Sequence, residues 1–396
     1  MKPVLIVGAG PVGLTAALLL LRRGIPCVLI ERGLSLPDDL RASTFHPPTL
    51  DLLERIGVAS ALIAEGLVSP TWQVRMHPTG ERAVFDLGLI ADATNHPYRL
   101  QCKQSVLCRI LFERFVAEGG DARLGYAAEK AVQNGDGIVL SLKDAAGERH
   151  DIAGEFLIAA DGARSTVRSQ FPFQFEGKTY PETTILATTR FPFQEHLPEL
   201  SHVNYVWKEN GGTFSLLRLK DLWRCSLYPD AGETIEEALD RSSILRKLGE
   251  IVPGPGGHSV DEIRPYRIHM RIADNYRHGR VLLAGDAAHV NSPSGGMGMN
   301  GGIHDAFELV ATIGEVLDGA ELGHLDRYTR RRKPIAETEI LVQADRNRAR
   351  MQERDPARRR ELLANLQHTA ADKGLARAHL LRTSMIEGLR KSLEIS

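Results

Sequence analysis

The chain has 396 residues, of which 43% are apolar and 25% are charged. This length exceeds one ordinary hydrophobic core and suits two closely packed domains, and the composition is that of a folded protein rather than a disordered one. The formal net charge is −1, so no overall field favours nucleic acid or an anionic membrane surface. A nucleic-acid partner is therefore not expected.

The cysteines indicate a reducing compartment. They are Cys27, Cys102, Cys108 and Cys225, and none forms a CxxC pair. Scattered thiols in a long chain favour a cytoplasmic protein with free cysteines. The fourteen histidines show no zinc-site spacing, so no metal is predicted. Glycines and a proline break the apolar stretch near the N-terminus into pieces too short to cross a bilayer, and no integral membrane contact is expected.

The start of the chain predicts a βαβ unit with a right-handed crossover. Residues 3–7 form a buried parallel strand, 14–23 a helix closed by Gly24, and 27–30 a second buried strand that ends at Glu31. Further helices are predicted at residues 49–56, 105–118 and 301–317, and further buried strands at 156–160 and 281–284.

The middle of the chain has a different pattern. Residues 71–87 and 183–228 contain short segments of alternating polarity, which is typical of antiparallel strands. Lys220 and Asp221 predict a tight turn between two of them. A helix over 234–248 and a loop over 252–257 follow.

The last part of the chain, from about residue 326, is rich in arginine and helical in pattern. Its arginines alternate with Glu and Asp, which favours a solvated helix surface with i,i+4 ion pairs over a nucleic-acid surface. For these helices, a dimer contact and packing back on the first domain both remain open, so the predicted state is a monomer or a homodimer.

Three glycines form the first motif. Gly8, Gly10 and Gly13 give GxGxxG between the first predicted strand and helix, where they permit a tight turn, close approach to a pyrophosphate and close helix packing. The following helix N-terminus offers N–H groups to phosphates. Glu31 follows Gly13 by 18 residues, and its carboxylate suits a ribose diol and repels a 2′-phosphate. The motif predicts FAD or NAD rather than NADP.

Two further motifs follow predicted buried strands. Asp161 opens the sequence DGARSTVR at a position that faces the ligand crevice of an open α/β sheet, although an ordinary capped turn would also suit it. Asp286 lies in GDAAH and is followed by Pro293 and the run GGMGMN. These glycines expose N–H groups at a helix start, which stabilises the anionic reduced form of a flavin.

The three motifs, in this order and spacing, resemble those of the single-component FAD-dependent aromatic hydroxylases typified by p-hydroxybenzoate hydroxylase. The resemblance covers nearly the whole chain and implies an α/β fold, with a Rossmann-type FAD-binding domain, an inserted antiparallel β-sheet substrate domain and a helical C-terminus. It places the FAD-binding domain, with the C-terminal helices, at residues 1–70, 101–172 and 277–396, and the substrate-binding domain at 71–100 and 173–276. The family usually has a second proline where this chain has Ser292.

The resemblance also implies which residues hold FAD. The glycine motif takes the pyrophosphate, Glu31 the ribose, and the loop from Pro293 the isoalloxazine, with Pro293 near the oxygen chemistry. Asp161 and its neighbour serve both FAD and transient NAD(P)H. The implied cofactor-binding set is Gly8, Gly10, Pro11, Val12, Gly13, Glu31, Arg32, Arg41, Gln104, Arg109, Asp161, Gly162, Gly285, Asp286, Pro293, Gly295, Gly296, Met297, Gly298, Met299 and Asn300.

The implied reaction is hydroxylation of an electron-rich aromatic or heteroaromatic ring. NAD(P)H reduces the flavin, and O2 then gives a flavin C4a-hydroperoxide that transfers one oxygen. The protein orients the ring and excludes water. There is no second GxGxxG for the nicotinamide, no CxxxxC redox pair of a disulfide reductase and no WxWxIP pattern of a halogenase.

The substrate is expected to meet the antiparallel sheet. The candidate contacts are Tyr205, Trp207, Arg218, Arg224 and Tyr228, each of which also suits a core or surface role. With Pro293, the residues Tyr205, Arg224 and Tyr228 are the catalytic candidates. His46, His77 and His269 are possible proton relays, although a structural role is the more common one for a histidine.

Three other functions remain open. A flavin-dependent reductase or dehydrogenase would not insert oxygen, and a quinone-biosynthesis hydroxylase would act on a lipid. A non-catalytic FAD-dependent scaffold would have no need for a glycine-rich loop around the flavin ring. The sequence leaves the substrate ring, the regiochemistry and the choice between NADH and NADPH undetermined.

Overall fold

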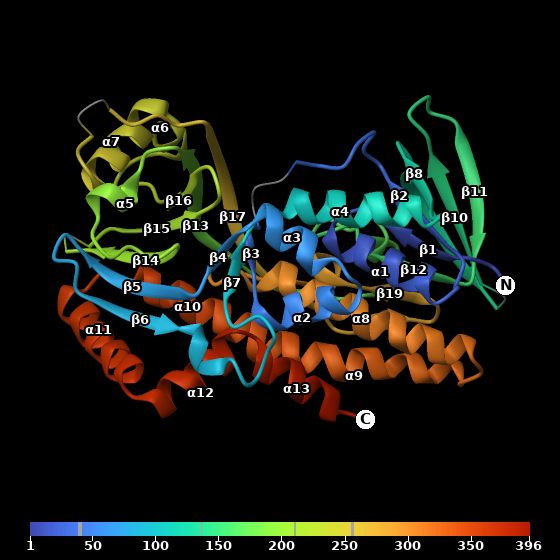
Figure 1. Ribbon diagram of the computed structural model, residues 1–396. Coiled ribbons are helices and arrows are strands. Elements are labelled where there is room, and N and C mark those ends of the chain that lie inside the picture. Colours follow the sequence, from blue (N-terminus) through green and yellow to red (C-terminus); the bar gives the residue numbers. More distant parts are fainter. Residues whose placement is uncertain (39–41, 136, 210, 255–256) are drawn as a thin grey trace.

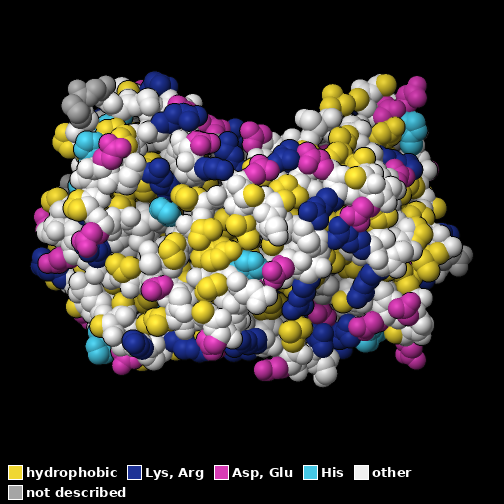
Figure 2. Space-filling model, viewed as in Figure 1, with side chains coloured by type: hydrophobic (Ala, Val, Ile, Leu, Met, Phe, Trp, Pro, Cys, Tyr) yellow, Lys and Arg dark blue, Asp and Glu magenta, His cyan; other side chains and the backbone are white. Residues whose placement is uncertain are grey.

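The protein is described here from a computed structural model, which covers residues 1–38, 42–135, 137–209, 211–254 and 257–396. Two large sheets form two lobes, and helices near the C-terminus run along one side of both (Figure 1). Basic and acidic side chains are intermixed over the face seen in Figure 2, in keeping with the near-zero net charge.

The first lobe is built on a six-stranded sheet of order β18-β19-β12-β1-β2-β8. Its centre is β1 (Val4–Val7), whose sequence VLIV is wholly buried, as a parallel strand covered on both faces requires. It pairs in parallel with β2 (Cys27–Glu31) and β12 (Phe156–Ala159), so the predicted βαβ unit is confirmed. The outer strands are β8 (Asp121–Leu124), β19 (Val281–Leu283) and β18 (Arg277–His278).

Helices of this lobe pack around α1 (Pro11–Arg22), which joins β1 to β2. It starts at a proline, whose missing N–H has no partner to lose at that position. The helix predicted from residue 301 starts earlier, because Gly296 adopts a left-handed conformation (φ 69°) and turns the chain into α8 at once. The other helices of the lobe are α2 (Pro47–Arg55), α3 (Ala59–Glu65), α4 (Gln104–Ala117) and α8 (Met297–Leu317).

Two small sheets complete this lobe. One contains β9 (Ala127–Asn134), β10 (Gly137–Lys143) and β11 (Arg149–Gly154), and it packs on the central core through Ile138 and Leu140. The other joins β3 (Thr44–Phe45), β7 (Arg99–Gln101) and β4 (Leu67–Ser69) and lies between the two lobes (Figure 1).

The second lobe is an eight-stranded sheet of order β20-β17-β13-β16-β15-β14-β5-β6, antiparallel except between β14 and β5. The predicted hairpin sheet is thereby confirmed, but β17 was not foreseen. Its strands are β5 (Thr71–His77), β6 (Arg82–Asp86), β13 (Phe175–Thr189), β14 (Val203–Lys208), β15 (Thr213–Arg218), β16 (Trp223–Leu227), β17 (Glu262–Ala273) and β20 (His289–Val290).

The two faces of this sheet have different neighbours. One face packs Phe214, Leu216 and Cys225 against a core that includes Ile244 and Leu248 of α7 (Arg241–Ile251). The expected single helix over 234–248 was wrong. Asp240 leaves the helical conformation (ψ 136°), so the segment forms α6 (Ile235–Leu239) and α7, beside the short α5 (Phe193–His196).

The other face meets the C-terminal helices and the first lobe. Leu363 of α11 (Pro356–Ala371) and Leu380 of α12 (Lys373–Thr383) pack with Trp72 and Phe85 in one cluster, so both helices cover the eight-stranded sheet, although the sequence grouped them with the FAD-binding domain. The C-terminal helices are α9 (Asp326–Ile335), a π-helical turn (Ala336–Leu341), α10 (Val342–Gln352), α11 (Pro356–Ala371), α12 (Lys373–Thr383) and α13 (Ile386–Glu394).

The arginine-rich segment is only partly the solvated surface that was predicted. Lys333 and Glu337 form an expected i,i+4 ion pair. Arg332 and Arg359, however, are each 1% exposed. Arg359 donates to backbone carbonyls at both ends of the β14–β15 turn, and so fastens α11 to the sheet.

Within the described residues, no helix is long and apolar enough to cross a membrane. The four cysteines are free and buried.

Candidate active site

A cavity of about 780 Å³ lies where the two lobes meet. Its walls include the carboxyl ends of β1, β2 and β12, which is where open α/β sheets bind ligands. The opposite wall is the face of the eight-stranded sheet that carries Tyr205, Ser215 and Ser226, which are paired across β14, β15 and β16. The volume is in the range of cofactor and small-molecule sites.

The glycine motif is shaped for close approach. Gly8 has φ 106°, and a Cβ there would lie 2.4 Å from the Ala160 carbonyl oxygen. A Cβ on Gly13 would lie 1.9 Å from the Gly8 carbonyl oxygen, so α1 could not pack this closely on the turn. A Cβ on Gly10 would meet no atom within 4 Å and would project into open space. This is the shape that an approaching pyrophosphate needs.

Glu31 and Asp161 provide carboxylates at the strand ends. Glu31 accepts hydrogen bonds from the N–H groups of Ala9 and Gly33, both at 2.9 Å, which fixes its carboxylate at the cavity wall. Asp161 accepts one from the Val167 N–H at 3.2 Å, while its Oδ1 is buried without a partner among the described residues. Burial raises the pKa of Asp161. An unpartnered acceptor beside this cavity fits a ligand hydroxyl.

The loop before α8 is held from behind by Asn300. The Asn300 amide donates to the carbonyls of Thr44 and Gly296 and accepts the His46 N–H. Gly295 and Gly296 both have positive φ, at 101° and 69°. Asn300 was predicted to touch the flavin, but it does not line the cavity, and it shapes the loop that does.

A buried ion network supports the second half of the site. Asp305 accepts hydrogen bonds from Arg332 Nε at 2.7 Å, His289 Nε2 at 2.8 Å and the Gly285 N–H at 3.2 Å. Burial would raise the pKa of Asp305, but Arg332 and His289 outweigh it and lower that pKa. Arg168 ties the second motif to the third, because it donates to the carbonyls of Ala163 and Ala287.

Most of the predicted cofactor residues meet in this cavity. Those that line it are Gly8, Gly10, Pro11, Val12, Glu31, Arg32, Gln104, Asp161, Gly162, Asp286, Pro293, Gly295, Gly296, Met297, Gly298 and Met299. Gly13 and Gly285 lie behind the wall, where they permit close packing. Arg41 lies outside the described residues.

Arg109 is not placed at the cavity. It is exposed and pairs with Glu65 and Glu113. Residues five apart on an α-helix differ in direction by about 140°, so Arg109 cannot share the cavity-facing side of α4 with Gln104.

The substrate candidates divide in the same way. Tyr205, Arg224 and Tyr228 line the cavity. Arg218 faces the other side of the sheet, over the Trp223 ring, because side chains alternate along a strand. Trp207 is wholly buried at the edge beneath α10, where its indole N–H donates to the Arg350 carbonyl at 2.9 Å.

The three histidines have separate places. His269 lines the cavity and hydrogen-bonds Thr179. His46 is fully buried, and its Nε2 donates to the Gly295 carbonyl at 2.8 Å. Burial and the nearby Arg99 charge lower the pKa of His46 to about 3, so it is neutral and holds the loop before α8.

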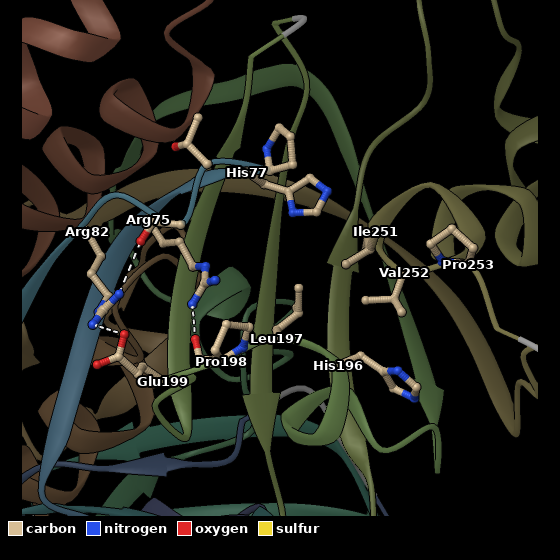
Figure 3. A pocket seen from close by; sticks show the side chains of 13 residues that line it. Arg75, His77, Arg82, His196, Leu197, Pro198, Glu199, Ile251, Val252 and Pro253 are labelled. Carbon is tan, nitrogen blue, oxygen red and sulfur yellow. Dashed lines mark hydrogen bonds and ion pairs between the residues drawn. The ribbon is translucent and has the colours of Figure 1, made fainter.

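His77 belongs to a second cavity of about 390 Å³, in the lobe built on the eight-stranded sheet (Figure 3). Two arginines that line this cavity are bound by other residues of its wall. Arg82 pairs with Glu199, and Arg75 donates to the Pro198 carbonyl at 2.9 Å.

Sequence reasoning missed several cavity residues. Tyr266 comes from the unforeseen strand β17, Tyr126 from the segment after β8, and Met351 from the end of α10. The alternation of β17 was a readable signal, whereas Met351 had none.

Comparison with known proteins decides the family. A model of the FAD binding domain matches residues 1–343. The chain belongs to this FAD-binding family. It is 31% identical over 394 residues to para-nitrophenol 4-monooxygenase of Pseudomonas sp. (strain WBC-3), covering 98% of this chain and 96% of that protein. It is 34% identical over 348 residues to 6-hydroxy-3-succinoylpyridine 3-monooxygenase of Pseudomonas putida (strain DSM 28022 / S16), covering 84% and 85%.

Solved structures agree with this assignment. The crystal structure of p-nitrophenol 4-monooxygenase from Pseudomonas putida DLL-E4 superposes with a TM-score of 0.90 at 30% identity, covering 98% of each chain. The protein is therefore an FAD-dependent monooxygenase of the aromatic-hydroxylase type, and the predicted fold class is confirmed.

Proposed function

We propose that this protein uses FAD, NAD(P)H and O2 to hydroxylate an electron-rich aromatic or heteroaromatic small molecule. One observation carries the proposal. The three cofactor motifs and the polar, aromatic face of the substrate sheet line a single continuous cavity. A ring bound against that sheet therefore lies beside the loop that would hold the flavin.

The residues fit FAD. The glycine turn and the α1 N-terminus would hold the pyrophosphate, Glu31 the ribose, and the loop from Pro293 to Gly296 the flavin ring. Arg109 has no part in this set, because it is paired elsewhere. When bound, the flavin would accept reducing equivalents from NAD(P)H and transfer one oxygen atom to the substrate ring.

Three side chains would orient the substrate. Tyr205 and Tyr228 project from the sheet into the cavity beside Arg224, which is 6% exposed. Burial raises the pKa of the Tyr228 hydroxyl, so this group stays protonated and acts as a hydrogen-bond donor rather than a base. Pro293 would stand on the reacting side of the flavin.

The division into domains and the location are part of the same proposal. The six-stranded sheet corresponds to an FAD-binding domain and the eight-stranded sheet to a substrate-binding domain, with α11 and α12 covering the latter. Free, buried cysteines support a cytoplasmic location.

The test begins with the absorbance spectrum of the purified protein, which should show bound flavin. NAD(P)H oxidation is then followed with a panel of nitrophenols, hydroxybenzoates and hydroxypyridines, chosen because the relatives are named for such rings. The expected product carries one oxygen atom from isotopically labelled O2. Substrate-stimulated NAD(P)H oxidation without an oxygenated product would instead indicate a reductase or dehydrogenase.

A further inference from the structure

The second cavity, of about 390 Å³, is separate from the cavity that holds the cofactor motifs. The two cavities share no lining residue in the described part of the chain. The wall of the second one is built by three segments, which are the hairpin of β5 and β6, the chain that follows α5, and the end of α7. Its volume lies in the range of small-molecule sites.

This cavity has a polar side and an apolar side. Figure 3 shows Arg75, Arg82 and Glu199 together on one side, and residues 251–253, with the sequence Ile-Val-Pro, on the other. His77 also lines the cavity, and burial lowers the pKa of His77, so its ring is neutral at pH 7.5. An apolar wall opposite a charged one suits a ligand that has both an apolar body and a charged group.

The polar side carries more positive than negative charge. Arg82 pairs with Glu199, whose side chain is 69% exposed. Arg75 is 3% exposed and donates to the Pro198 carbonyl at 2.9 Å, which is an uncharged partner. No described carboxylate forms an ion pair with Arg75. Buried charges are normally paired, because removing a charge from water is costly.

The surrounding charges do not compensate Arg75. Burial lowers the pKa of Arg75, and the Arg82 charge lowers it by more than the Glu199 charge raises it. Glu250 precedes the apolar side of the cavity, but its carboxylate pairs with Lys208 and Arg246, both at 2.7 Å. The Arg75 guanidinium is therefore a buried positive charge on the wall of a cavity, with one uncharged acceptor.

The backbone holds this arrangement in place. Glu199 adopts φ 57°, a conformation that residues with a Cβ rarely take and that persists where contacts enforce it, often at ligand sites. Its carbonyl accepts the Gln73 amide at 3.2 Å, and its carboxylate is committed to Arg82. Gly80 brings the β5–β6 turn close to the Arg75 guanidinium, since a Cβ there would lie 3.3 Å from Nη2.

We propose that this second cavity binds a small organic acid, with its carboxylate on Arg75 and its apolar body against residues 251–253. A planar guanidinium suits a carboxylate, and one negative charge would neutralise the excess on this wall. A neutral ligand of the same shape would leave Arg75 uncompensated and would bind more weakly. The proposal does not depend on the reaction at the other cavity, because the two sites have no residue in common.

The experiment measures binding to the FAD-loaded protein by titration calorimetry at pH 7.5. The probes are benzoate, cyclohexanecarboxylate and hexanoate, each compared with its amide, which has nearly the same shape without the charge. At least one acid should bind about tenfold or more tightly than its amide. The flavin absorbance should stay unchanged as this site fills. No preference for the acid in any of the three pairs would overturn the proposal.

One set of variants tests the charge. Arg75→Met should remove the preference for the acid and leave the amide affinity nearly unchanged, and Arg75→Lys should restore part of the preference. Arg190→Met is the matched control, because Arg190 is an exposed arginine of the same lobe and lines neither cavity. Equal weakening of acid and amide by Arg75→Met would show a structural role for Arg75 and refute the assignment.

A second set of variants locates the acid. Pro253→Trp enlarges an exposed side chain of the apolar wall and should weaken binding of the acid at least about tenfold. Ser226→Trp fills the other cavity and should leave that binding intact. The opposite pattern would place the acid in the other cavity and overturn the proposal. If Arg75→Met does not fold, the acid-to-amide ratio of the wild type and the Pro253→Trp result decide.

Discussion

Two buried histidines should make the stability of this protein fall in mild acid. His46 and His304 are 0% and 2% exposed. Burial lowers the pKa of each from 6.5 to about 3, with nearby Arg99 adding to the effect at His46 and Arg332 at His304. His304 Nε2 hydrogen-bonds the Thr49 hydroxyl at 2.8 Å, so the neutral ring has a partner in the folded state.

The sign follows from proton binding. Between pH 6.5 and pH 3 the unfolded chain takes up a proton at each histidine and the folded chain does not, so acid favours unfolding. The stabilisation is complete above pH 6.5 and is lost as the pH falls. One pKa unit corresponds to about 1.4 kcal/mol, so lowering the pH from 7.5 to 5.0 should cost about 2 kcal/mol for each histidine.

The assay compares urea unfolding of the FAD-saturated protein at pH 7.5 and pH 5.0. His304→Gln keeps an amide nitrogen for the Thr49 hydroxyl and cannot titrate, so its loss between the two pH values should be about 2 kcal/mol smaller than that of the wild type. His368→Gln is the matched control, because His368 is exposed and its environment hardly changes on unfolding. An unchanged pH dependence in His304→Gln would refute the reasoning.

Four other substitutions test the glycine turn, the loop before α8 and the packing of α11. Gly10→Ala should leave the stability of the apoprotein unchanged and weaken FAD binding. Gly13→Ala places a Cβ 1.9 Å from the Gly8 carbonyl oxygen and should lower both the stability and the FAD affinity. Thermal melting measures the stability, and flavin fluorescence titration measures the affinity. Asn300→Ala removes three hydrogen bonds and should cost about 3 kcal/mol of unfolding free energy, measured in urea without added FAD. Arg359→Met leaves backbone carbonyls of the β14–β15 turn without their hydrogen-bond donor, and should lower the free energy of unfolding by at least about 3 kcal/mol. The expected sign is early proteolysis after residue 353, and full protease resistance would contradict this.

The meeting of the cofactor-motif residues at one cavity was predictable because its signals are local. Gly8, Gly10 and Gly13 lie within one turn between a strand and a helix, and Glu31 ends the next strand. Short-range geometry forces these residues together wherever the rest of the chain goes. Pattern matching still failed for Arg109, because a motif letter does not say which side of a helix carries the side chain.

The opposite wall of the cavity depends on long-range strand pairing. Tyr205, Ser215 and Ser226 share one face only because three strands align in a particular register, which residue types alone do not specify. One position along the chain separates Leu217, which lines the cavity, from Arg218, which faces away from it. The choice among Tyr205, Trp207 and Arg218 therefore needed the structure.

The C-terminal segment of this chain reaches the cavity, although it lies beyond the three cofactor motifs. The family match ends at residue 343, yet Met351 lines the cavity and Arg350 interacts electrostatically with Tyr205, which also lines it. Substitutions there alter charge and shape at the ring without touching any residue that approaches the pyrophosphate. Selection for a new substrate can thus act on this segment while flavin binding is conserved, and the motifs that identify the enzyme class carry no information about its substrate.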